Sequence, residues 1–361
     1  MILKTLGYSF PEAALKERYL RSLHARLGIG FLLFVLILVV SVFSVSKGSM
    51  HMSIGDILKA LFNLSEGSYV VWNIRIPRTL GALLAGASLG VAGAVMQTVL
   101  RNPLASPFTL GISHGAAFGA AFAIIVLGSG KTYFAGTGEI TILKGYVVVF
   151  SAFVGALATV IVILGLSFWR ELTPEAIILV GVALSSLFTA ATMLLQYFAS
   201  DFQVAATVFW TFGDLGKAGW FENKLMALAF IISFIYFIKN RWNFNALLWG
   251  DEVAKSLGVD VKRLRSLGMF FSAFVVSVCT AFLGIIGFVG LISPHIVRLL
   301  VGGDHRFLIP YSALFGAFFL YVSDLIGRTI MAPAVLPVGI ITSFAGVPMF
   351  FYLLMKKRRL Q

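Results

Sequence analysis

The sequence has 361 residues, of which 59% are hydrophobic and only 12% are charged. Soluble domains carry about twice that charged fraction, and a bilayer accommodates apolar surface that a soluble chain of this length has no means of hiding. The formal net charge of +13 does not indicate nucleic-acid binding, because the basic residues lie in tails and short loops without interleaved aromatic residues. These observations predict an all-α integral membrane protein.

Stretches without charged residues predict about ten transmembrane helices, since one span needs roughly 20 apolar residues. The stretch between Arg265 and Arg298 is too long for one span, and its glycines and Pro294 predict a break between two shorter helices. The spans are expected within 26–47, 78–101, 101–131, 144–170, 175–201, 224–239, 265–298 (two helices), 306–328 and 328–356.

Ten spans place both termini on the same side of the membrane. Most of the 28 lysines and arginines fall on that side. Because cytoplasmic loops of membrane proteins carry an excess of lysine and arginine, this distribution predicts that both termini are cytoplasmic. We therefore expect a single membrane domain over 1–361, with a cytoplasmic amino tail at 1–27 and a long cytoplasmic loop at 239–266. The single cysteine, Cys279, lies in an apolar stretch and is expected to be a packing residue.

Small residues recur every four positions in the second and third expected spans. Such a stripe lets two helix backbones approach closely, so we expect close packing at both helices. The residues are Ala82, Gly86, Gly90 and Ala94, then Gly111, Gly115, Gly119 and Ala123.

Two charged segments have two interpretations each. Arg75 and Arg78 precede the second span on the predicted outer side. They either anchor the helix at the membrane interface or form a positive surface that docks a partner. In the 239–266 loop, Val253, Leu257 and Val261 recur every four residues beside charges, which predicts a short amphipathic helix. That helix lies either on the headgroups or in the groove of a cytoplasmic partner.

Apparent enzyme motifs lack their structural context. The G-x-S-x-G pattern at 111–115 opens a predicted membrane helix rather than following a strand, and Gly130-Lys-Thr132 lacks the earlier glycine of a phosphate-binding loop. The sequence has no Cys/His cluster and no His-Glu-x-x-His pair, so we expect no catalytic residue, no metal site and no cofactor in this chain. Asp324 is the only acid near the interior of a span, which disfavours an ion-coupled secondary transporter; this class stays the alternative.

Several motifs, in order along the chain, resemble the FecCD family of permeases, the importers for cobalamin, haem and ferric siderophores. The resemblance covers roughly residues 25–358. The matching segments are 75–78, 86–97, 101–107 with Leu110-Gly111, 248–261, 287–298, 303–306, 336–339 and 346–348.

The resemblance implies a permease with ten spans that works as a homodimer. Two cytoplasmic ATPase subunits, which use ATP and Mg, would drive it, and an external binding protein would deliver the substrate. ATP hydrolysis would then occur in a separate chain. Transport would proceed by alternating access between outward and inward states, along the homodimer axis.

The resemblance also assigns roles to residues. Arg75, Arg78 and Arg328 match the arginines that dock the binding protein. The coupling segment matches 250–266 and includes Asp251, Glu252, Ala254, Leu257 and Gly258.

In the family, the fifth and tenth spans line the path. Here their polar residues interrupt apolar helices, where an unused hydrogen-bonding group costs free energy. These residues either line the transport path or form hydrogen bonds between helices. The residues predicted to line the path are Ser185, Ser186, Thr189, Thr192, Met193, Gln196, Thr342 and Ser343.

This sequence departs from the family pattern at three places. Val335 replaces a usual Glu, Ser323 replaces a usual Ala, and Leu172-Thr-Pro-Glu175 stands where the cobalamin importer has small polar residues. The resemblance implies a metal-chelate-type substrate of the iron-siderophore, haem, cobalamin or molybdate class, and these departures leave the gate residues and the individual compound open.

Overall fold

The structure is a computed structural model that describes residues 12–46, 52, 54–62, 64, 67–129, 134–135, 139–140, 145–170 and 172–357. The first part of the predicted amino tail and the Gly130-Lys-Thr132 segment lie outside the described residues.

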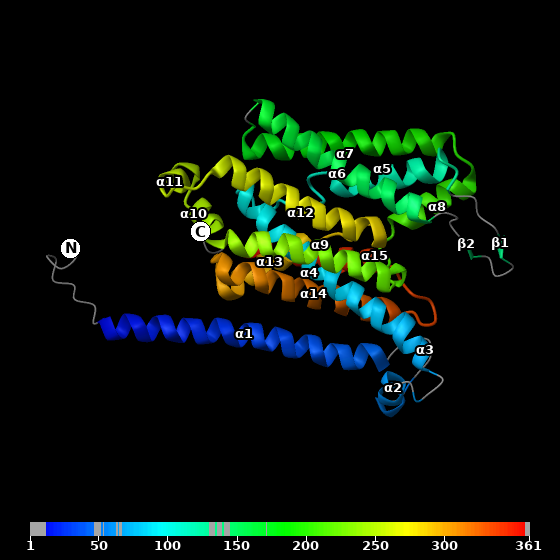
Figure 1. Cartoon of the computed structure of the whole chain (residues 1–361), viewed down its shortest axis with the longest axis horizontal. Coiled ribbons are helices and arrows are strands. Elements are labelled where there is room, and N and C mark those ends of the chain that lie inside the picture. The colour runs from blue at the N-terminus through cyan, green and yellow to red at the C-terminus, as the bar shows by residue number, and fades with distance from the viewer. Residues whose placement is uncertain are drawn as a thin grey trace.

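The described chain is almost entirely helical (Figure 1). The helices are α1 (Glu12–Ser46), α2 (Ile54–Leu61), α3 (Ser68–Val70), the π-helical turn η1 (Val71–Arg75), α4 (Ile76–Val99), α5 (Ile112–Ile125), α6 (Gly145–Arg170), α7 (Pro174–Tyr197), α8 (Asp201–Thr211), the 3₁₀ turn η2 (Leu215–Lys217), α9 (Trp220–Lys239), α10 (Arg241–Leu247), α11 (Asp251–Ser256), α12 (Val261–Leu283), α13 (Val289–Val301), α14 (His305–Thr329) and α15 (Val338–Lys357). The chain also has one short antiparallel pair, β1 (Phe134–Ala135) with β2 (Glu139–Ile140), of two residues each. The all-α fold class is confirmed.

The ten predicted spans correspond to ten apolar helices in the described chain. Seven are long and apolar enough to cross a membrane, and three are shorter: 112–125, 289–301 and 338–352. A helix of 13 or 14 residues is about 20 Å long, less than the hydrocarbon thickness of about 30 Å. The number of complete crossings therefore stays a prediction.

The predicted break between the seventh and eighth spans is confirmed. Helix α12 ends at Leu283 and α13 begins at Val289. Gly284 and Phe288 both have positive φ, 81° and 65°, a conformation that no helix can continue through. Helix α8 was not predicted. It has only 11 residues, too few to be found in a search for uncharged stretches as long as a transmembrane span.

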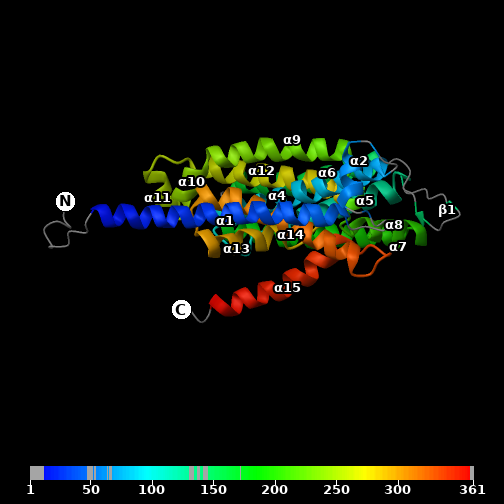
Figure 2. The ribbon, with the colours of Figure 1, turned by 90° about the horizontal axis from the view of Figure 1, so that it is seen from below.

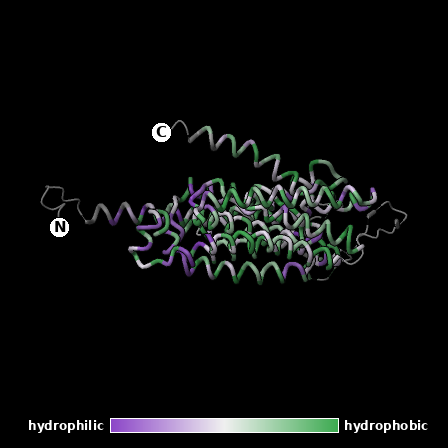
Figure 3. The backbone as a smooth tube through the Cα atoms, turned by 90° about the horizontal axis from the view of Figure 1, so that it is seen from above, coloured by the Kyte–Doolittle hydropathy of each residue, from purple (hydrophilic) through white to green (hydrophobic). Residues whose placement is uncertain are grey.

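The ends of the bundle agree with the predicted topology. The start of α1, the end of α15 and the short helix α11 all lie at the same end of the bundle (Figure 2). Hydrophilic residues gather at the two ends and hydrophobic residues fill the length between them (Figure 3). That pattern is expected of helices whose middle lies in hydrocarbon and whose ends meet water; which end is cytoplasmic stays a prediction.

Helix α4 is the centre of the bundle and packs against α9, α12, α13 and α14. Its glycines face backbone: a Cβ at Gly86 would overlap the carbonyl of Gly316, and a Cβ at Gly93 would overlap that of Gly290. Gly115 of α5 meets α6 in the same manner, at Gly155. The predicted close packing is thus confirmed for both stripes.

The second stripe begins one turn later than predicted. Gly111 precedes α5 as its N-cap with φ of 80°, and therefore belongs to the loop rather than to the helical face. Ser113, the centre of the hydrolase-like motif, is buried in the first turn of α5.

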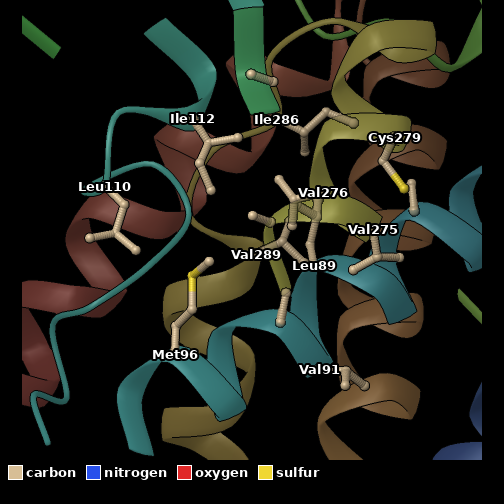
Figure 4. Close-up of a cluster of buried hydrophobic side chains, with 14 of the residues drawn as sticks. Leu89, Val91, Met96, Leu110, Ile112, Val275, Val276, Cys279, Ile286 and Val289 are labelled. Carbon is tan, nitrogen blue, oxygen red and sulfur yellow. The ribbon is translucent and has the colours of Figure 1, made fainter. Parts of the chain in front are cut away.

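The buried core extends over most helices of the bundle, and Figure 4 shows the part where α4 and α12 meet the break after α12. Cys279 is 2% exposed, carries a free thiol and points among valine and leucine side chains. It is a packing residue, as the sequence indicated.

Gly93→Ala should destabilise the protein, because the new Cβ would overlap the Gly290 carbonyl and neither backbone can retreat. We expect a loss of about 1–3 kcal/mol in unfolding free energy, typical of overpacking, measured by thermal or denaturant unfolding in detergent. Gly165→Ala in α6 is the control, since its Cβ meets nothing within 4 Å. Equal stability of the two variants would contradict the packing role.

Candidate translocation site and its charged ends

A cavity of about 480 Å³ lies where four interruptions of helical structure meet. They are the α4–α5 loop, the end of α8, the break between α12 and α13, and the start of α15. Irregular backbone at membrane depth is tolerated where it lines a cavity or is buried in protein. The lining residues are Ser106, Phe108, Thr109, Thr211, Phe212, Gly213, Ile285, Gly287, Phe288, Leu291, Gly339, Ile340, Ser343 and Phe344.

Backbone hydrogen bonds join three of these interruptions. Asp214 donates its N–H to the Leu283 carbonyl at 2.8 Å, and Gly339 donates to the Gly213 carbonyl at 3.3 Å. These bonds supply partners to groups that the broken helices leave unpaired, which a membrane interior requires. The cavity is therefore built by the fold and does not result from loose loops.

Of the predicted path residues, Ser343 alone lines this cavity. Its neighbour Thr342 is buried. Both hydroxyls donate to the Gly339 carbonyl, at 2.8 Å from Ser343 and 3.1 Å from Thr342. The α7 residues approach the cavity from behind the α4–α5 loop, because the Gly111 backbone packs against Ser185 and Gly181 packs against Leu110.

Helix α7 leaves most of its surface uncovered within one chain. Ile177 and Gly181 are its only buried residues, and Met193 is 62% exposed. The residues Ser185, Thr189, Thr192 and Gln196 follow a helical spacing that places them on one face.

The hydroxyl groups of α7 are satisfied inside the helix. Ser185, Thr189 and Thr192 donate to the carbonyl four residues earlier at 2.7–2.8 Å, and Ser186 does so at 3.2 Å. These internal bonds remove the cost of placing a hydroxyl in an apolar setting. Among the described residues these four hydroxyls donate within α7 and not to another helix, and their role in the path stays a prediction.

Two of the three predicted docking arginines, Arg78 and Arg328, bind Asp324, and Arg75 lies one turn before Arg78 at the same end of the bundle. The Asp324 carboxylate is 1% exposed and accepts hydrogen bonds from Arg78 at 2.8 Å and from Arg328 at 2.9 Å. Arg78 also lies 3.8 Å from Asp214, and Arg75 is 7% exposed. We call Arg75, Arg78, Asp324 and Arg328 the arginine cluster.

The sequence prediction missed the partner of these arginines. Asp324 and Arg328 are four residues apart on α14, a spacing at which helical side chains pair, so part of the cluster was readable. The Arg78 contact was not, because it joins residues 246 positions apart. Buried charges of this kind persist only when paired and hydrogen-bonded.

At the opposite end, the predicted short helix is present as α11, but Val261 of the predicted stripe begins α12 and is buried. The coupling role of this segment stays a prediction. Gly250 and Gly258 flank α11 with φ of 108° and 82°, conformations that favour glycine. Leu257 is 66% exposed and Val253 43%, while Ala254 is buried against the bundle. Glu252 pairs with Lys255 on the exposed side at 3.2 Å.

Asp251 holds α11 to the rest of the protein instead of facing outward. Arg265 of α12 donates to its carboxylate at 2.9 Å and, through Nε, to the Val99 carbonyl at the end of α4, also at 2.9 Å. Arg101 adds a second cation at 3.8 Å. Trp249, just before α11, is 79% exposed; the sequence prediction missed it because a lone tryptophan carries no periodicity.

A buried polar network lies beside this junction. The His305 ring contacts Thr98 Oγ1 of α4 at 2.7 Å and Asn245 Oδ1 of α10 at 2.8 Å. Burial would raise the pKa of Asp304, the residue before α14, but hydrogen bonds from Arg306 and Asn245 outweigh it and bring that pKa to about 2. The network fixes α10 and α14 to the end of α4.

Comparison with known proteins identifies the family. The family model of the FecCD transport family matches residues 36–356. The chain belongs to the FecCD transport family. It is thus a multi-pass membrane permease subunit of the ABC transporter class, a transport component and not an enzyme, with the ATPase in a separate subunit.

Three relatives illustrate the match. A Methanocaldococcus jannaschii protein named as an ABC transporter permease is 54% identical, over 91% of this chain and 94% of its own. The hemin transport system permease HmuU of Yersinia pestis is 35% identical, over 92% and 96%. The vitamin B12 import permease BtuC of Citrobacter koseri is 37% identical, over 90% and 93%.

Solved structures agree with this assignment. An inward-facing structure described as a metal-chelate type ABC transporter superposes with a TM-score of 0.79 at 30% identity, covering 91% of this chain and 99% of that one. PsaBC from Streptococcus pneumoniae shares the fold, with a TM-score of 0.54 at 18% identity over 83% and 95%.

Asp324→Asn should be strongly destabilising, because it leaves Arg78 and Arg328 buried without their shared carboxylate. We expect a loss of about 3–5 kcal/mol, the range for breaking a buried ion pair from one side, measured by unfolding in detergent. Glu252→Gln is the control: its pair with Lys255 is exposed and worth at most about 0.5 kcal/mol. A small effect at both sites would show that the cluster does not hold this end of the bundle together.

Proposed function

We propose that this chain is the permease subunit of a binding-protein-dependent ABC importer for a metal-chelate substrate of the iron-siderophore, haem, cobalamin or molybdate type. The observation that carries the proposal is the cavity at the four helix interruptions, reached by Ser343 and backed by α7. The relatives named for hemin and vitamin B12 and the metal-chelate type structural neighbour support the same substrate class.

A homodimer would complete the path. Helices α7 and α15 leave broad faces uncovered in one chain, with Phe344 of α15 at 77% and Leu187 of α7 at 61% exposed, and α15 diverges from the bundle (Figure 2). A second copy placed against these helices would enclose the polar face of α7. Ten spans with cytoplasmic termini, and substrate movement along the dimer axis, complete this proposal.

In alternating access, each end of the bundle would bind a different partner protein. A cytoplasmic ATPase would receive the exposed apolar surface formed by Trp249, Val253 and Leu257, since a short apolar stripe needs a groove that buries it. An external binding protein would bring acidic residues to the arginine cluster, which carries more arginines than carboxylates. Charge pairs of this kind steer encounter and set register.

Gly258→Leu should uncouple transport from ATP hydrolysis. Its Cβ would meet nothing within 4 Å, so any effect comes from the positive φ of 82° that leucine rarely adopts. We expect the reconstituted permease to lose ATPase co-purification, substrate-stimulated hydrolysis and at least about tenfold of its uptake, and Leu257→Asp to do the same.

Lys255→Ala is the matched control on α11, because it removes only an exposed pair. Normal co-purification and hydrolysis in both Gly258→Leu and Leu257→Asp would refute the coupling role. Uptake that persists without ATP would instead favour the alternative, an ion-coupled secondary transporter.

Cysteines placed at Thr189 and Ser343 should react with a membrane-impermeant thiol reagent, and bound substrate should slow that reaction. Both positions are expected to face the aqueous path, whereas Ile231→Cys on α9 is exposed toward lipid and should stay unlabelled. The native Cys279 is buried and gives little background. Failure to label either path position at any stage of the cycle would disprove the assignment.

A further inference from the structure

An apolar groove lies between α6 and α9 on the flank of the bundle. Both helices pack against α12 but hardly meet each other, so α12 forms the floor of a gap about 330 Å³ in volume. Every lining residue is apolar or aromatic: Tyr146, Val149, Phe150, Phe153, Phe221, Leu225, Leu228, Ala229, Ile232, Phe274, Val278, Ala281 and Phe282.

Aromatic pairs bound the groove. Tyr146 of α6 meets Phe221 of α9 edge-on at one end, with ring centroids 6.2 Å apart, and Phe153 meets Phe274 of α12 at 6.3 Å. Rings in such contacts are held in place, so the groove has fixed walls. Small residues on its floor, Ala281 and Val278, keep it hollow.

The groove continues into a second hollow that contains two charged side chains. That hollow, about 250 Å³, shares Tyr146, Val149, Ala281 and Phe282 with the groove and adds Lys217 and Glu222. The Lys217 ammonium forms no hydrogen bond or ion pair with any described residue. The Glu222 carboxylate accepts the Gly219 N–H at 3.1 Å, which caps α9, and keeps a second oxygen for another donor.

Two tryptophans beside this hollow have an arrangement typical of the lipid headgroup region. Trp220, three residues beyond Lys217, stacks on Trp72 with centroids 6.3 Å apart and donates its indole N–H to the Trp72 carbonyl at 2.9 Å. Tryptophans with one polar edge satisfied are typical of the membrane–water interface. The hydrocarbon side of the groove then runs from this interface toward the membrane centre.

We infer that the groove and the hollow together bind one phospholipid with an amine-bearing headgroup. An acyl chain lies in the groove, because the protein spans a bilayer and the residues that line the groove are apolar or aromatic, with the Tyr146 hydroxyl as their one polar side-chain group. The lipid phosphate pairs with Lys217, and the lipid ammonium pairs with Glu222. The opposite charges of these two side chains select a zwitterionic headgroup over a purely anionic one.

The test measures retained lipid on the full-length protein by native mass spectrometry. The protein is washed in detergent containing equal amounts of phosphatidylethanolamine and phosphatidylglycerol. We expect the wild type to retain phosphatidylethanolamine in preference to phosphatidylglycerol, and Lys217→Gln to retain about tenfold less, the effect of one charged contact. Leu228→Trp should lower retention similarly by filling the groove.

Ile231→Trp is the matched control, since Ile231 is exposed on the same helix but outside the groove. Equal retention by Leu228→Trp and Ile231→Trp would mean ordinary surrounding lipid and would overturn the inference. Unselective retention of the two lipids, or unchanged retention in Lys217→Gln, would also overturn it. If Leu228→Trp dissociates the oligomer, this face is an interface between copies and the lipid assignment is wrong.

Discussion

The fold depends on the contact of backbone with backbone along α4. Hydrocarbon gives no hydrophobic advantage to one helix pair over another, so association in a membrane relies on close van der Waals contact and on satisfied polar groups. Gly86, Gly90 and Gly93 bring α4 against the backbones of α13 and α14. Once α4 is fixed in this way, the interruptions before α5 and after α12 are held at the same depth, and the cavity between them follows.

Much of this architecture was predictable because membrane burial makes uncharged stretches visible. The ten stretches, the break after Leu283 and the two packing stripes all follow from composition and spacing. Helix α8 and the shortness of α5 were not predictable. The sequence signal for a span is the total hydrophobicity of a stretch, and a short helix joined to an apolar loop has the same total hydrophobicity as a full-length span. Gly111 was assigned to a helix for the same reason.

The candidate site was less predictable than the fold. The spacing of apolar residues indicated a short helix in the 239–266 loop, yet Asp251 holds α11 to α12 and α4, a contact set by tertiary packing. Asp324 was singled out as an unusual acid, while its pairing with Arg78 required the three-dimensional fold. The hydroxyl groups of α7 were read as groups in need of a partner, and each finds one in its own helix. Local spacing predicts helices and turns, whereas partners distant in sequence are specified by the packing of whole helices.

The position of α4 has one further consequence. Its first turn carries Arg78, and its last residue, Val99, accepts the hydrogen bond from Arg265 that also holds Asp251. A single helix of 24 residues, about 36 Å long, thus joins the arginine cluster to the α11 junction with no flexible segment between them. Thermodynamic linkage is reciprocal. If ligands at the two ends both bind in a way that depends on the position of α4, each changes the affinity of the other by the same factor, so the two ends of the bundle share one equilibrium.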